Sequence, residues 1–168
     1  FYWNTSAEAC LERMIKENDK FWSLRKDKLQ QSDLNQLEVI SLASIVESET
    51  AKVDEMPMVA GLYLNRLKQG IKLQSDPTVI YSIQQDYPDT VIRRVFFRDL
   101  VYDSPYNTYL NKGLPPGPIR IPNAKAIDAV LNAEKHRYIF MCANPEKPGY
   151  HSFATNLRGH NRNRDKYI

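Results

Sequence analysis

Residues 39–51 read VISLASIVESETA. From Val39 to Val46 the segment has almost no polarity, and two carboxylates, Glu47 and Glu49, then follow two residues apart. Burying a carboxylate is costly unless the group is paired, hydrogen-bonded or protonated. Either the segment reaches solvent at Ser48, or one of the two acids has a chemical role.

The apolar segment predicts a helix that is buried on most of its sides, because hydrophobic residues cover its whole circumference. Ser32 or Asp33 is the predicted cap, and the helix ends near Thr50. Around it, the spacing of apolar residues predicts further helices, and two strands joined by a Pro/Gly turn. The helices are expected at residues 6–31, 55–69, 77–85, 123–134 and 156–168, and the strands at 138–143 and 150–155.

These elements predict an α+β fold, predominantly helical with a small antiparallel sheet. Residues 88–122 contain six prolines and predict a loop, of a length for which a functional role is favoured. The 168 residues suit one domain with a small appendage. The chain begins with FYWNTS and not with methionine, so we expect a piece of a longer protein.

The composition excludes several classes of protein. A formal charge of +3, with Lys and Arg interspersed among Asp and Glu, gives no basic stripe for nucleic acid. No apolar run reaches the roughly 18 residues that a membrane span requires. The two cysteines, Cys10 and Cys142, form no C-x-x-C motif. Buried free thiols are expected for them, and a disulfide between them is the alternative.

The two carboxylates cannot act as a pair while both are helical. Residues two apart on a helix point about 200° away from each other, so only one of Glu47 and Glu49 is expected to face a cleft. Each follows apolar residues along its own side of the helix, and the pattern does not choose between them. An acid against apolar walls has a raised pKa and can donate a proton near neutrality. Two solvated acids at a helix end are the alternative.

Four blocks of the sequence, in this order, resemble the endolytic murein transglycosylase family, also called MltG or YceG-like. The blocks are ASIVESET at 43–50, VAGLYLNRLKQGIKLQSDPTVIY at 59–81, SPYNTYLNKGLPPGPI at 104–119 and HSFATNLRGHN at 151–161. The resemblance covers about residues 37–163. It implies an N-terminal helical or linker segment, 1–36, and a lysozyme-like catalytic domain, 37–168.

The resemblance implies cleavage, within peptidoglycan strands, of the bond between N-acetylmuramic acid and N-acetylglucosamine, with formation of a 1,6-anhydro end. In the family the glutamate of A-S-I-V-E is the acid/base, which selects Glu47. The C6 hydroxyl of the sugar is the nucleophile, so one carboxylate is enough, whereas ordinary glycosidases need two. Asp76 is the remaining candidate partner. We expect it to cap the helix that Pro77 begins; in the alternative it supports muramidase-like hydrolysis with water.

The resemblance further implies residues that hold the glycan, each with a structural alternative. A loop amide can bond the backbone, a tyrosine can pack, and polar residues near the last helix can tie it to a loop. His151 and His160 lack the further ligands that zinc needs, so no metal site is expected. The expected substrate-binding residues are Gln74, Asp76, Tyr106, Asn107, His151 and Asn156.

No cofactor is expected. Aminodeoxychorismate lyase, a name attached to the family, would require pyridoxal phosphate and a phosphate-binding loop, and the chain has no Gly-rich loop of that kind. A non-catalytic glycan-binding module is a further alternative. The resemblance implies peptidoglycan strands and, by analogy, cell-wall synthases as partners. It also implies that the parent protein is anchored in the inner membrane, with the catalytic domain periplasmic or extracytoplasmic.

Overall fold

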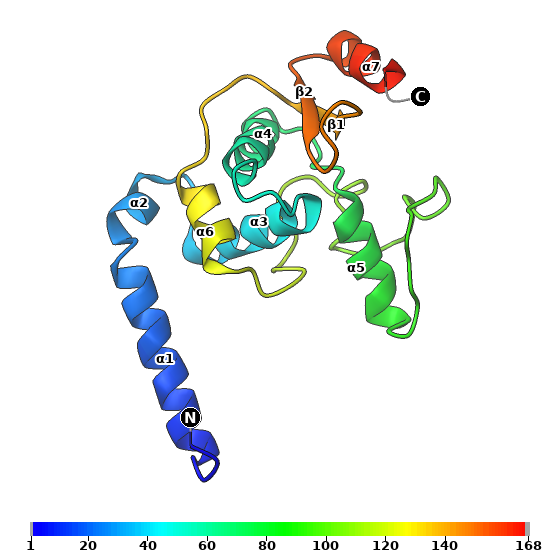
Figure 1. Cartoon of the computed structure of the whole chain (residues 1–168). Helices are drawn as coiled ribbons and strands as arrows, with labels where there is room; N and C mark the ends of the chain where they lie inside the picture. The colour runs from blue at the N-terminus through cyan, green and yellow to red at the C-terminus, as the bar shows by residue number, and fades with distance from the viewer. Residues whose placement is uncertain (1, 167–168) are drawn as a thin grey trace. The chain divides into compact units, whose positions relative to one another are not determined.

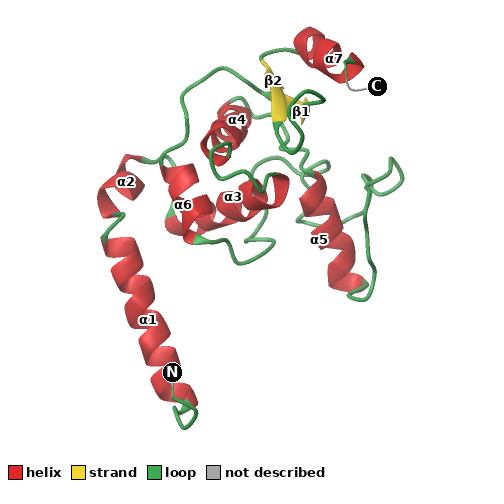
Figure 2. Cartoon of the chain, viewed as in Figure 1, coloured by secondary structure: helices red, strands yellow, loops and turns green. Residues whose placement is uncertain are grey.

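The computed structural model describes residues 2–166. Within that range the chain forms seven α-helices and one two-stranded antiparallel sheet (Figures 1 and 2), which confirms the predicted α+β class. The chain divides between Asn35 and Gln36 into two compact units. The elements are α1 (Ala7–Ser23), α2 (Lys26–Gln31), α3 (Gln36–Glu49), α4 (Met56–Lys68), α5 (Asp76–Asp86), α6 (Ala124–Leu131), β1 (Phe140–Ala143), β2 (His151–Ala154) and α7 (Leu157–Asp165).

The first unit holds two helices where the sequence predicted one. Ser6 caps α1, because its hydroxyl accepts a hydrogen bond from the Ala9 N–H at 3.2 Å. The break follows at Arg25, whose guanidinium donates to the Phe21 carbonyl at 3.0 Å. A continuous helix would offer that carbonyl to the Arg25 N–H, which instead donates to Trp22 at 3.0 Å. The side chain therefore competes with the helical bond and ends α1.

The core of the second unit is built around α3. Its buried residues include Leu42, Ile45 and Val46, which are 0 % exposed, and helices α4, α5 and α6 pack against it (Figure 1). Each fully buried side chain of this size contributes roughly 1.5–3 kcal/mol. The predicted start of this helix was wrong: Ser32 accepts a hydrogen bond from the Leu34 N–H at 3.1 Å and forms a turn before the helix begins.

Helix α4 is held against the segment that leads into the sheet. A side chain at Gly61 would place its Cβ 2.3 Å from the Glu134 carbonyl oxygen, so only glycine permits this approach. The Asn65 amide donates to the carbonyls of His136 at 2.8 Å and Tyr138 at 3.0 Å. Asn65 therefore fixes the segment that enters β1, and residues of β1 line the cavity described below.

The segment from Tyr87 to Asn123 contains neither helix nor strand, as the prolines predicted (Figure 2). Asn107 lies inside this loop and is 0 % exposed. Its amide donates to the carbonyls of Leu100 at 3.0 Å and Tyr102 at 2.8 Å, and its oxygen accepts the Tyr109 N–H at 2.9 Å. One buried side chain thus satisfies three backbone groups in a segment that has no helix or strand.

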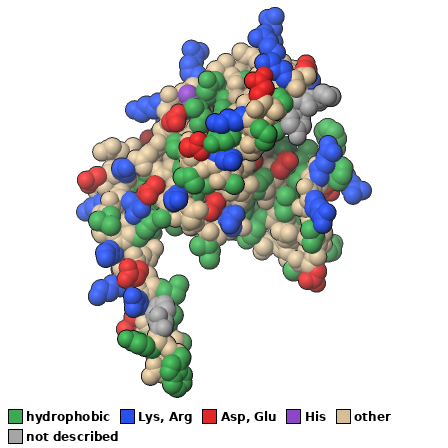
Figure 3. Space-filling model, in the orientation of Figure 1, with side chains coloured by type: hydrophobic (Ala, Val, Ile, Leu, Met, Phe, Trp, Pro, Cys, Tyr) green, Lys and Arg blue, Asp and Glu red, His purple; other side chains and the backbone are tan. Residues whose placement is uncertain are grey.

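Strands β1 and β2 pair with Phe140 opposite Ala154 and Ala143 opposite His151. Helix α7 packs against both strands, and the Asn156 side chain caps it by accepting the Gly159 N–H at 2.9 Å. Cys10 and Cys142 are free, half-buried thiols. No helix within residues 2–166 combines the length and the apolarity that a membrane crossing requires. On the face seen in Figure 3, basic and acidic side chains are interspersed.

Candidate active site

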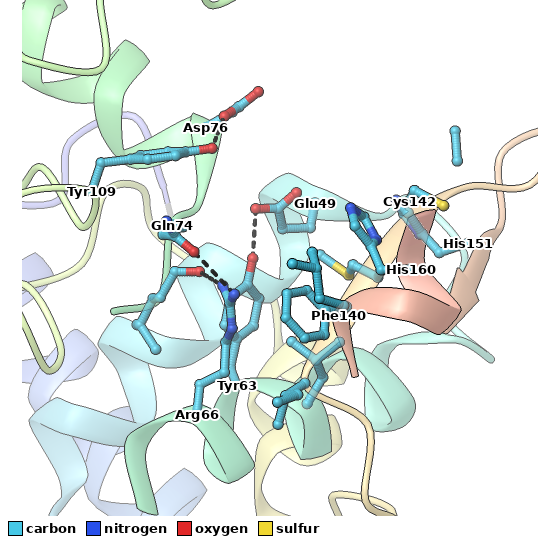
Figure 4. Close-up of a pocket in the computed structure, with 16 residues that line it drawn as sticks. Glu49, Tyr63, Arg66, Gln74, Asp76, Tyr109, Phe140, Cys142, His151 and His160 are labelled. Carbon is cyan, nitrogen blue, oxygen red and sulfur yellow. Dashed lines mark hydrogen bonds between the residues drawn. The ribbon is translucent and has the colours of Figure 1, made fainter. Parts of the chain in front are cut away.

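A cavity of about 410 Å³ lies where the end of α3, helix α4 and the start of α5 meet the sheet and α7 (Figure 4). Its lining is mixed: charged and hydroxyl-bearing side chains on one part, apolar strand residues on the other. The lining includes the following polar and aromatic residues: Glu49, Tyr63, Arg66, Gln74, Asp76, Tyr109, Phe140, His151 and His160.

Glu49, in the last turn of α3, is the acid that faces this cavity. One oxygen of its carboxyl group, Oε1, accepts two hydrogen bonds, from the Tyr63 hydroxyl at 2.7 Å and from the Ser75 hydroxyl at 2.5 Å. Within residues 2–166 the other oxygen, Oε2, has no hydrogen-bond partner. The two donors therefore fix the carboxyl group and leave one oxygen free for a ligand.

Burial raises the pKa of Glu49 above its ordinary value, and the nearby charge of Asp76 raises it further, while the bonds from Ser75 and Tyr63 oppose the shift. Tyr63 is 1 % exposed, and burial, together with Glu49, raises the pKa of its hydroxyl well above the ordinary value. The hydroxyl therefore stays protonated and donates. With its pKa raised, the Glu49 carboxyl group can donate a proton and later accept one.

Glu47 lies elsewhere. Its side chain is 13 % exposed, and its carboxylate accepts hydrogen bonds from the Asn123 backbone N–H at 3.1 Å and from the Asn123 side-chain amide. The Arg120 guanidinium is 3.8 Å away. Asn123 in turn caps α6 by accepting the Ala126 N–H at 3.0 Å. Glu47 thus anchors the start of α6, and it is not among the residues that line the cavity.

Gln74 lines the cavity, and its own backbone is strained. Its φ of 52° lies in the left-handed region, which non-glycine residues rarely occupy. Arg66 holds it there: the guanidinium donates to the carbonyl of Leu73 at 2.5 Å and to Oε1 of Gln74 at 3.0 Å. Because Oε1 is engaged, the Gln74 amide offers its N–H donors to a ligand. Strain that surrounding contacts maintain is typical of functional sites.

Asp76 shares the cavity with Glu49 and does not cap α5, so that prediction was wrong. The capping position belongs to Ser75, and Asp76 is the first residue of the helix. The Asp76 carboxylate accepts a hydrogen bond from the Tyr109 hydroxyl at 2.6 Å. Burial, and then this bond to Asp76, raise the pKa of Tyr109, which keeps it a donor. The Tyr109 side chain is half-buried, so a ligand in the cavity can still contact it.

His151 lines the cavity on the sheet side. Glu55, whose side chain is 5 % exposed, orients it: the Glu55 carboxylate accepts the His151 backbone N–H at 2.6 Å and lies 2.9 Å from Nδ1. The ring is thereby held in one orientation toward the cavity. No group of three or more His, Cys, Asp or Glu side chains suited to a metal ion occurs within residues 2–166.

Three predicted contact residues lie outside the cavity lining. Asn107 is fully buried and bonded to its own loop, so the predicted contact between its side chain and a glycan does not fit its position. Tyr106 packs against Tyr81, with ring centroids 4.8 Å apart, and Asn156 caps α7. The cavity instead contains residues that the sequence did not single out, namely Tyr63, Arg66, Tyr109 and Phe140.

Comparisons with known proteins agree with this architecture. Residues 1–166 match the model of the YceG-like family. The chain is 33% identical over 165 residues to an endolytic murein transglycosylase of Bacillus subtilis, and 30% identical to one of Streptococcus pneumoniae. Each match includes 98% of this chain. It includes only 44% of the Bacillus relative and 30% of the Streptococcus relative, so the chain spans less than half of their length. A crystal structure of a YceG-like protein from Listeria monocytogenes superimposes with a TM-score of 0.81 at 33% identity, covering 96% of this chain and 50% of that one.

Proposed function

The chain belongs to the YceG-like family, and from this premise we propose that it is the catalytic domain of an endolytic murein transglycosylase, with Glu49 as its acid and base. The observation that carries the proposal is the Glu49 carboxyl group: it lines the cavity, its pKa is raised by burial, and two hydroxyl donors leave its Oε2 free. This moves the acid/base role from Glu47, which the resemblance selected, to the other carboxylate of the same helix.

The proposed reaction needs one carboxyl group. Protonated Glu49 gives its proton to the oxygen that links N-acetylmuramic acid to N-acetylglucosamine, and the bond between that oxygen and C1 breaks. The C6 hydroxyl of the muramic sugar then attacks C1, and the Glu49 carboxylate accepts the hydroxyl proton. The products are a free N-acetylglucosamine hydroxyl and a 1,6-anhydro end, and no water is consumed.

The neighbouring groups suit these steps. The hydroxyls of Tyr63 and Ser75 stabilise Glu49 while it is ionised between the two proton transfers. Gln74 and His151 line the same cavity and are proposed to contact the glycan. Tyr109 holds Asp76 beside the site.

A second candidate function is muramidase-like hydrolysis, because Asp76 places a second carboxylate in the cavity. In that reaction Asp76 would activate water while Glu49 acts as the acid. The Asp76 carboxylate already accepts the Tyr109 hydroxyl at 2.6 Å, so one of its oxygens is engaged within the protein, which favours the reaction with one carboxylate.

Digestion of purified peptidoglycan in water enriched in heavy oxygen distinguishes the two functions. The transglycosylase reaction gives 1,6-anhydro ends that lack one water and carry no label, because the attacking oxygen comes from the sugar. Mass spectrometry of the products measures both features. Labelled reducing ends would contradict the proposal and identify a hydrolase, and in that case Asp76→Asn should abolish the label.

The proposal includes the setting in which the domain acts. Its substrate is peptidoglycan, so the domain works outside the cytoplasm, and the parent protein is anchored in the inner membrane. Cell-wall synthases are the proposed protein partners. The name shared by the relatives, endolytic murein transglycosylase, supports peptidoglycan as the substrate and action outside the cytoplasm. The membrane anchor and the synthase partners rest on the family resemblance alone.

A further inference from the structure

Arg66 brings a cation into the same cavity. The residue is 8 % exposed and lies on α4, one turn beyond Tyr63. Burial lowers the pKa of its guanidinium, yet an arginine side chain remains charged in proteins. A buried cation is stable when an anion or a full set of acceptors surrounds it.

Neither condition is met by the residues that the structure describes. The guanidinium donates to two neutral oxygens, those of Leu73 at 2.5 Å and Gln74 at 3.0 Å. Its Nε is buried without a hydrogen-bond partner, and no carboxylate within residues 2–166 forms an ion pair with it. The two acids of the cavity are bonded to hydroxyl groups instead, Glu49 to Tyr63 and Asp76 to Tyr109.

His160 adds a second unsatisfied nitrogen to this part of the cavity. Its Nδ1 is buried and has no hydrogen-bond partner among residues 2–166, and its ring stacks on Phe140 with centroids 5.3 Å apart. The Arg66 guanidinium carbon lies 5.7 Å from the centre of the same Phe140 ring. Figure 4 shows Arg66, Phe140 and His160 along one side of the cavity. Buried polar atoms without partners are rare in proteins and mark positions where a ligand or water completes the bonding.

We propose that the Arg66 guanidinium, with His160 beside it, binds a carboxylate of the murein substrate in the cavity that contains Glu49. A guanidinium has five N–H donors in a planar fork that matches the two oxygens of a carboxylate. Two of the five donate to described residues, Leu73 and Gln74. The inference rests on the proposed function, because murein supplies two carboxylates of this kind: the lactyl group of a muramic acid without its peptide, and the acidic residues of a peptide stem.

Binding measurements with matched glycans test the inference. The protein is the full chain carrying Glu49→Gln, so that the ligands are not cleaved. The first ligand is an N-acetylglucosamine oligomer, which is neutral. The second alternates N-acetylglucosamine with muramic acid and has free lactyl carboxylates. The third is the same glycan with those carboxylates converted to primary amides, and the fourth is the glycan with peptide stems. We expect the lactyl carboxylate ligand or the stem-bearing ligand to bind about 10- to 100-fold more tightly than the amide.

The ligand that shows this gain identifies the source of the carboxylate, and added salt should reduce the gain. Equal affinity for all charged and neutral glycans would overturn the inference while leaving the proposed function intact. Absence of binding by every glycan, the neutral oligomer included, would instead count against the proposed function.

Variants of the protein identify the side chain that causes the preference for the carboxylate ligand. Arg66→Gln should remove the preference for the carboxylate, Arg66→Lys should retain part of it, and His160→Gln should reduce it. Arg158→Gln is the matched control, because Arg158 is exposed on α7 and does not line the cavity. If Arg66→Gln fails to fold because it releases Leu73 and Gln74, the comparison of carboxylate with amide on the Glu49→Gln protein, which keeps Arg66, still decides. If a folded Arg66→Gln protein still prefers the carboxylate ligand to the amide, Arg66 has only a structural role and the inference is wrong.

Discussion

Replacing Glu49 with glutamine is expected to lower the rate of peptidoglycan cleavage by about 10²- to 10⁴-fold, the usual contribution of a general acid. Glutamine has the same shape, and its oxygen can still accept the bonds from Tyr63 and Ser75. It has no proton to give to a glycosidic oxygen. The measurement is the rate at which soluble fragments are released from purified peptidoglycan, with thermal unfolding followed in parallel to establish that the variant is folded.

Glu47→Gln is the matched control, since it makes the same chemical change two residues away on the same helix. We expect its rate to stay within a few-fold of the wild-type rate. Its cost falls on stability, about 1–3 kcal/mol, because the carboxylate that bonds Asn123 beside Arg120 is lost. If Glu47→Gln abolishes cleavage and Glu49→Gln leaves it intact, the assignment of the acid is reversed.

Replacing Asn107 with alanine is expected to lower the free energy of unfolding by about 3–5 kcal/mol. The change leaves the carbonyls of Leu100 and Tyr102, both in half-buried residues, and the Tyr109 N–H without the partner they have now. Each unsatisfied buried group costs about 1–3 kcal/mol, and part of that cost is relieved by relaxation of the loop. Chemical denaturation of both proteins measures the difference.

Asn111→Ala is the control for this prediction. Asn111 lies in the same loop and also donates to two carbonyls, of Ser104 at 2.9 Å and Asn107 at 3.2 Å, but it is exposed, so water can replace its bonds. We expect a loss below about 1 kcal/mol. An Asn107→Ala protein that keeps its stability but binds the glycan weakly would restore the role in substrate binding that the resemblance implied.

Much of the fold follows from periodicity and end signals. The apolar run of α3 predicted a buried helix, and the two strands joined by a Pro/Gly turn are also present in the structure. The boundaries were harder to predict, because they depend on side chains that compete for backbone groups. Arg25 ends α1 by bonding the Phe21 carbonyl, and nothing in the spacing of hydrophobic residues signals that bond.

The choice between the two acids could not be made from the helix that bears them. Both follow apolar neighbours, and the distinction comes from residues far along the chain: Tyr63 and Ser75 approach Glu49, whereas Asn123 approaches Glu47. The same holds for Asp76, for which a capping role is a local expectation. Ser75 takes that position, and the long loop brings Tyr109 to Asp76. Long-range contacts of this kind leave no periodic signal in the sequence.

For Glu49 to act as the acid, position 49 must hold a carboxylic acid that keeps its proton more strongly than an ordinary glutamate. A pH titration by carbon NMR, with the side-chain carboxyl groups of glutamate labelled, measures this directly, and the signal that disappears in Glu49→Gln assigns the residue. We predict a Glu49 pKa above the ordinary value of about 4.3, because burial disfavours its charged form. A Glu49 signal that titrates at or below that value would contradict the account.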